Sequence, residues 1–161
     1  MKYLGEKSVS SFFSKLLAVL WYVVLVFSII GFFILIILIV ITSIELPVFA
    51  EAAAKLKDPD WDKFKNIPLF FKILIAPYCA VLVVFVLRIM KSAQAIFSNF
   101  AKNIVFDKNN VEKIAKTGKM MIVLSIMTFN LSTFLVSVIL LIVCEIFKNG
   151  TALQEEHDLT V

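Results

Sequence analysis

The side chains that perform most enzyme chemistry are few in this chain, and they form no recognisable constellation. His157 is the single histidine, and neither a second metal ligand nor a nucleophile accompanies it. Cys79 and Cys144 lie inside apolar stretches, where a thiol behaves as a small hydrophobic side chain. No base is placed to activate a serine or a cysteine. We therefore predict no catalytic residue, no metal ligand and no cofactor, and a protein that is not an enzyme.

A run of polar residues interrupts the last apolar stretch, 120–144. At 100° per residue of helix these side chains fall on two faces, one with Ser125, Thr128 and Ser132 and the other with Asn130, Thr133 and Ser137. Hydrogen bonds between helices in a membrane are each worth only about 0.6–2 kcal/mol. We predict that helix packing, within the chain or in a homo-oligomer, uses Asn130, Ser132, Thr133 and Ser137. In the alternative, an oligomeric pore or transporter accessory subunit, the same faces line a wet cavity.

A second group of polar side chains is basic and precedes that stretch. The segment 88–119 carries Arg88, Lys91, Lys102, Lys108, Lys113, Lys116 and Lys119, against two acidic residues. Such a segment is attracted to anionic lipid headgroups by about 1 kcal/mol per well-placed cation. It contains no recognisable nucleic-acid-binding module, so we expect no direct contact with nucleic acid. The candidate contacts for a protein partner are Lys108, Lys113, Lys116 and Lys119.

The composition shows what must position these groups. Of 161 residues, 61% are hydrophobic and 17% charged, whereas a typical globular domain has roughly 45–50% and about 25%. A soluble core of this size cannot hide so much apolar surface. We predict an all-α integral membrane protein forming a single membrane domain over 1–161, with the lipid bilayer as its principal partner.

Three apolar stretches are long enough to cross a bilayer, which takes about 20 residues. They cover 16–44, 67–87 and 120–144 and predict three transmembrane helices. Lys72 lies near the start of the second, where its ammonium can reach the interface. Between the spans we place an external loop over 45–66, with a short helix at 50–55, and a basic cytoplasmic loop over 88–119. The segment 90–106 either continues the second span or lies on the inner leaflet, and Asn109 with Glu112 predicts a capping box for the next helix.

Lysine and arginine counts predict the orientation, because translocation of these residues is disfavoured. Ten lie in the first fifteen residues and in 88–119, against five or six in the first loop, its flank and the tail. We expect the N-terminus and the basic loop to be cytoplasmic. With three spans, the first loop and the acidic tail, 145–161, face outward.

The tail carries a family resemblance. Residues 146–161 read IFKNGTALQEEHDLTV and residues 106–114 read FDKNNVEKI. Both segments, together with an alanine-rich external segment and a proline in the second span, resemble the bacterial membrane family named domain of unknown function 2975. The resemblance covers most of the chain and is specific in the tail and the central loop.

The resemblance implies a location and a partner but no enzyme activity. It implies the bacterial cytoplasmic (inner) membrane. Because genes of this family often neighbour a small helix-turn-helix regulator of the Cro/C1 type, it also implies membrane-based control of transcription. The family usually has four spans, and the 25 residues of 120–144 are too few to cross twice. The alternative is a four-helix-like arrangement in which this segment is re-entrant, turning around Asn130.

Overall fold

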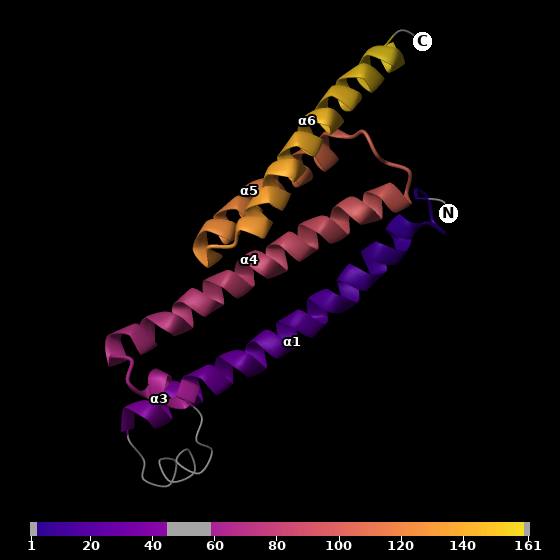
Figure 1. Ribbon diagram of the computed structural model, residues 1–161. Coiled ribbons are helices and arrows are strands. Elements are labelled where there is room, and N and C mark those ends of the chain that lie inside the picture. Colours follow the sequence, from indigo (N-terminus) through magenta and orange to yellow (C-terminus); the bar gives the residue numbers. More distant parts are fainter. Residues whose placement is uncertain (1–2, 45–58, 160–161) are drawn as a thin grey trace. The chain divides into compact units, whose positions relative to one another are not determined.

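The computed structural model describes residues 3–44 and 59–159, and over these two ranges the chain is helical and contains no strand. The helices are α1 (Val9–Ile44), α3 (Pro59–Lys65), α4 (Leu69–Ala101), α5 (Lys108–Thr128) and α6 (Leu131–Leu159) (Figure 1). The predicted all-α fold is confirmed. The predicted external helix at 50–55 lies outside the described residues.

Three of these helices are long and apolar enough to cross a membrane: Val9–Ile44, Leu69–Ala101 and Leu131–Glu156. Large apolar side chains such as Phe27, Ile37 and Val81 are exposed along them. In water this exposure would drive aggregation, whereas in a bilayer it is the surface that contacts lipid. The prediction of three candidate membrane helices is confirmed, although the third begins later than 120.

The chain forms two compact units, one from Met1–Val24 with Phe85–Val161 and one from Leu25–Val84. In the second unit, Lys72 has only 3% of its surface exposed. Its ammonium donates a hydrogen bond to the carbonyl of Lys65 at 2.9 Å and lies 5.7 Å from the centre of the Phe64 ring. The side chain therefore extends past the start of its own helix, as a lysine does when it reaches for a membrane interface.

The apolar stretch 120–144 is not one helix, in contrast to the single transmembrane helix that its length predicts. Helix α5 ends at Thr128, and Phe129 adopts the left-handed conformation (φ 50°, ψ 38°). The amide of Asn130 then donates to the carbonyl of Ser125 at 3.0 Å, while its side-chain oxygen accepts from the amide of Thr133 at 2.9 Å. Phe129 thus closes one helix and Asn130 caps the next. The turn lies where the re-entrant alternative placed it.

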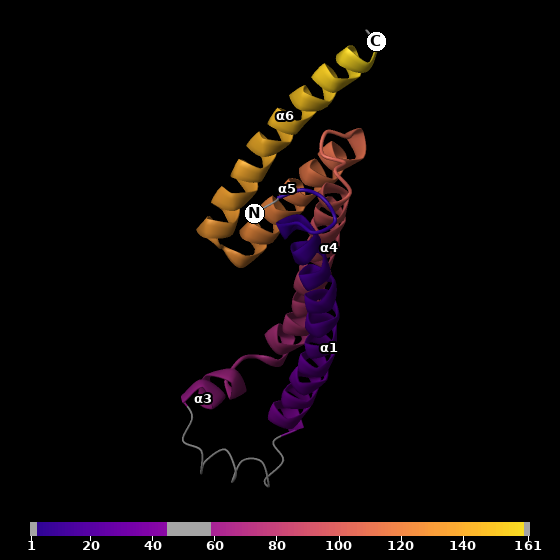
Figure 2. The same ribbon diagram turned by 90° about the vertical axis from the view of Figure 1, so that its right-hand side faces the viewer.

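Helices α5 and α6 run side by side in opposite directions from this turn (Figures 1 and 2). The ammonium of Lys108, at the start of α5, lies 2.9 Å from a carboxylate oxygen of Glu155, near the end of α6. A bilayer with a hydrocarbon core of about 30 Å cannot separate two atoms in contact. This contact contradicts the expectation that the tail faces away from the basic segment, because the hairpin brings the end of α6 back to the start of α5.

The connection between α4 and α5 confirms one expectation and corrects another. Helix α4 continues to Ala101, so 90–101 extends the second span rather than forming a separate helix. Helix α5 starts at Lys108, two residues before the start that a cap at Asn109 predicts. Its N-cap is Asp107, whose carboxylate accepts from the amide of Asn109 at 3.1 Å. Aspartate and asparagine satisfy the free backbone amides at a helix start about equally well. Because Asp107 precedes Asn109 in the chain, a cap at Asp107 lets the helix begin earlier.

Candidate partner-binding surface

The four lysines predicted to contact a partner all lie on the first three turns of α5, but the structure treats them differently. Lys108, Lys116 and Lys119 are exposed, whereas Lys113 is half-buried. Because α5 is continuous from Lys108 to Thr128, these lysines are fixed to a helix that runs directly into the apolar hairpin. These four lysines therefore lie on a helix rather than in a loop.

Lys108 is held by the end of α6. The hydrogen bond and the charge of Glu155 raise the pKa of Lys108 above its ordinary value of 10.5, against a small opposing effect of desolvation. Since the pair is solvent-exposed, its contribution is screened by water and salt. Its structural effect is to tie the last turns of α6 to the first turn of α5.

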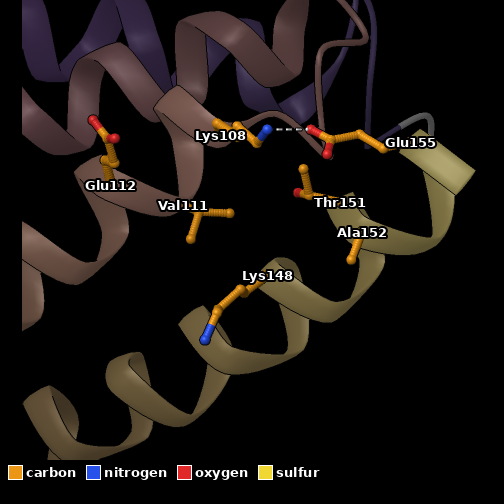
Figure 3. Close-up of a pocket in the computed structure, with 7 residues that line it drawn as sticks. All are labelled: Lys108, Val111, Glu112, Lys148, Thr151, Ala152 and Glu155. Atoms are coloured by element: carbon orange, nitrogen blue, oxygen red, sulfur yellow. Dashed lines mark ion pairs between the residues drawn. The ribbon is translucent and has the colours of Figure 1, made fainter.

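A shallow groove of about 300 Å³ lies beside this ion pair, between the start of α5 and the end of α6 (Figure 3). Its charged residues are Lys108 and Glu112 from α5 and Lys148 and Glu155 from α6. Lys148 also lies 3.5 Å from Glu145, one turn earlier on its own helix. Two lysines and two glutamates leave the groove without net charge, so it is not selective for anions.

Lys113 and its neighbours join α5 to α4. The hydroxyls of Ser92 and Thr117 lie 2.6 Å apart, and that of Thr117 donates to the carbonyl of Lys113 at 2.7 Å. These contacts satisfy polar groups in a half-buried interface. Lys116 and Lys119, three residues apart and exposed, are therefore the two candidates of the four that are best placed to meet a partner.

A small apolar core stands behind this surface. It is formed by Ile96 of α4, Ile114 of α5 and Cys144 of α6. The Phe100 and Phe147 rings stack against one another at its edge, with centroids 5.7 Å apart, and Phe106 adds a third ring 5.5 Å from Phe147. Cys144 is a buried packing residue whose thiol donates to the carbonyl of Val111 at 3.4 Å, in agreement with its interpretation as a small hydrophobic residue.

Sequence reasoning missed Asn110 as a structural residue. Its side chain is fully buried. The side-chain oxygen accepts a hydrogen bond from the side-chain amide of Asn99 at 2.6 Å, and the side-chain nitrogen donates to the backbone carbonyls of Ile104 and Val105 at 2.8 and 3.1 Å. These bonds fix the connection between α4 and α5. The signal in the sequence is an asparagine on the apolar side of an amphipathic helix, which needs a partner if it is buried.

The four residues predicted to pack helices fall in different places. Ser137 is fully buried where α6 meets α5, and its hydroxyl donates to the carbonyl of Phe134 at 2.6 Å. Thr133 is half-buried, whereas Asn130 and Ser132 are exposed at the turn. Ser137 is thus enclosed between the two arms of the hairpin.

A row of small residues explains why α5 and α6 pack closely. Ser137, Cys144 and Thr151 are spaced by seven residues on α6, and all three are buried. Opposite them, a Cβ atom at Gly118 would lie 2.7 Å from the Leu141 side chain. Small residues let two helix backbones approach in a membrane. The seam between the helices is therefore defined by residue size as much as by hydrogen bonds.

In comparisons with protein-family models, with curated proteins and with solved structures, no match to this chain was found.

Proposed function

We propose that this chain is a non-enzymatic protein of the bacterial inner membrane that restrains a small soluble helix-turn-helix regulator of transcription, and that it belongs with the family that its tail and central loop resemble. The proposed contact is the exposed face of α5 carrying Lys116 and Lys119, with Lys108 and Lys113 beside it. The N-terminus, this face and the acidic tail lie on the cytoplasmic side.

The observation that supports this proposal best is the continuity of α5. One helix carries exposed lysines at its start and an apolar hairpin arm at its end, so a protein bound to the lysines is tethered to the membrane by a rigid element. Charge at the rim of an interface raises association rates and favours partners of opposite charge. The proposal therefore expects an acidic patch on the partner.

Capture from detergent-solubilised membranes tests the proposal. The full-length protein is the bait, and proteins recovered with it are identified by mass spectrometry. The bait with Lys116→Glu and Lys119→Glu is compared with a control bait carrying Lys63→Glu and Lys65→Glu, which changes the charge equally at the end of α3. We expect a small helix-turn-helix protein with the wild-type and control baits, and at least a tenfold lower recovery with the α5 variant. Equal recovery with all three baits, or recovery of no such protein, contradicts the proposal.

A further inference from the structure

Hydrogen bonds within the first unit place α1, α4 and α5 in a defined register. The Trp21 indole donates to the carbonyl of Leu87 at 3.1 Å, and the Ser14 hydroxyl donates to that of Gln94 at 3.4 Å. The Ser92–Thr117 contact then aligns α4 with α5. These contacts show which residues of the three helices lie at the same height.

In this register, the basic residues nearest the apolar stretches lie at one level along the helix axes. Lys15 follows Ser14 and so lies at about the level of Gln94, whereas Lys116 and Lys119 lie on either side of Thr117, which is level with Ser92. Helix α4 adds two basic residues at this level, Arg88 and Lys91. At 1.5 Å of rise per residue, all five basic side chains start within about 8 Å of one another along the helix axes. The Lys91 ammonium also lies 5.7 Å from the ring centre of Trp21. Basic residues and a tryptophan at one level along the helices are typical of a membrane–water interface. We call these five residues the basic belt.

The α5–α6 hairpin extends only a short way beyond the basic belt. From Lys119 to Phe129 there are ten residues of helix, or about 15 Å, which is half of a hydrocarbon core of about 30 Å. From 120 to 144 the hairpin carries no charged residue. At its tip Phe129 is 94% exposed and Leu131 71% exposed.

We propose that the α5–α6 hairpin enters one leaflet of the bilayer and returns, with Phe129 and Leu131 near the bilayer centre and the basic belt at the lipid phosphates. The belt lies at the level of anionic headgroups, so a protein bound to Lys116 and Lys119 would sit at the membrane surface. The apolar tip is covered by acyl chains. This placement does not depend on a protein partner, so it stands or falls separately from the proposed function.

A full crossing by the hairpin conflicts with the charges on α5. The packing of Gly118 against Leu141 and the Cys144–Val111 contact hold the two arms together along their length. If α6 crossed the whole bilayer, α5 would carry Glu112, Lys116 and Lys119 into the hydrocarbon beside it. Charged side chains at that depth are costly and need partners. Insertion to half depth leaves these three side chains at the headgroups or in water.

Cysteine labelling from both sides of intact vesicles tests the depth. The background is the full chain in which Cys79 is replaced by serine and Cys144 by alanine. Phe129→Cys and Leu131→Cys are introduced into it separately. Each variant is treated with a membrane-impermeant maleimide added to the outside of right-side-out or inverted vesicles. Asn109→Cys, beyond the basic belt, and Ser43→Cys, at the far end of α1, are the controls for the two faces. Labelling after detergent solubilisation measures the total thiol.

We expect Asn109→Cys and Ser43→Cys to react from opposite sides, and both tip variants to react at least tenfold more slowly from either side than after solubilisation. Labelling of the tip from the side that labels Ser43→Cys would show a full crossing and overturn the proposal. Labelling from the side that labels Asn109→Cys would show a hairpin in water and overturn it equally. Two tip positions keep the test decisive if one variant fails to fold.

Discussion

The ammonium of Lys108 and the carboxylate of Glu155 lie 2.9 Å apart, joining the first turn of α5 to the last turns of α6. These residues are far apart in the sequence and are brought together by the reversal at Phe129 and Asn130. The contact means that the acidic tail stands beside the basic surface and not across a bilayer from it. Glu155 therefore competes with any acidic partner for Lys108, whereas Lys116 and Lys119 remain exposed.

The Lys108–Glu155 pair predicts a dependence of stability on alkaline pH. Because the folded protein raises the pKa of Lys108 above 10.5, the contribution of the pair is fully present below that pH and is lost as the pH rises through the pKa of the folded state. We expect Glu155→Gln to lower the melting temperature in detergent at neutral pH, and the difference from wild type to shrink above pH 10.5.

The control for this experiment is Glu112→Gln. Glu112 lines the same groove and makes no ion pair among the residues that the structure describes. It should show no comparable dependence above pH 10.5. A difference for Glu155→Gln that stays constant through the titration of Lys108 would mean that the pair does not form in solution.

Asn110 predicts a larger effect on folding. Replacing it by leucine removes three hydrogen bonds at a fully buried position and leaves the amide of Asn99 and two backbone carbonyls without their partner. An unsatisfied buried polar group costs about 1–3 kcal/mol, so we expect Asn110→Leu to lower the free energy of unfolding by at least that amount. Chemical denaturation in mixed micelles, followed by circular dichroism, measures it. The adjacent Asn109→Leu, at an exposed position, should change it by less than about 0.5 kcal/mol.

Gly118 predicts that the α5–α6 seam tolerates no large side chain. A Cβ atom at this position already meets Leu141 at 2.7 Å, whereas a Cβ atom at Gly31 of α1 meets nothing within 4 Å. Overpacking typically costs about 1–3 kcal/mol, so Gly118→Leu should destabilise the protein by that amount. Gly31→Leu should be neutral or stabilising, because leucine favours a helix more than glycine does. Thermal unfolding of both variants in the same detergent compares them; equal melting temperatures would show that the seam is loose.

Composition was enough to predict an all-α chain with three candidate membrane helices, because long apolar runs have one stable solution in a bilayer. The break at Phe129 was harder to predict, since the residue in the left-handed conformation is neither glycine nor asparagine. A turn around Asn130 was expected only as an alternative, because the 25 residues of 120–144 are too few to cross a bilayer twice. The ion pair of Lys108 and the burial of Asn110 depend on tertiary packing, which no local pattern contains.

The hairpin is tested most sharply by the side of the membrane on which residue 161 lies. Alkaline phosphatase, which is active only outside the bacterial cytoplasm, and green fluorescent protein, which fluoresces when it folds inside, are each fused after Val161 and, in a second pair, after Lys57. We expect fluorescence without phosphatase activity for the fusions at Val161, and the reverse pattern at Lys57. Phosphatase activity without fluorescence at Val161 would place the tail across the membrane from the basic surface and contradict the hairpin.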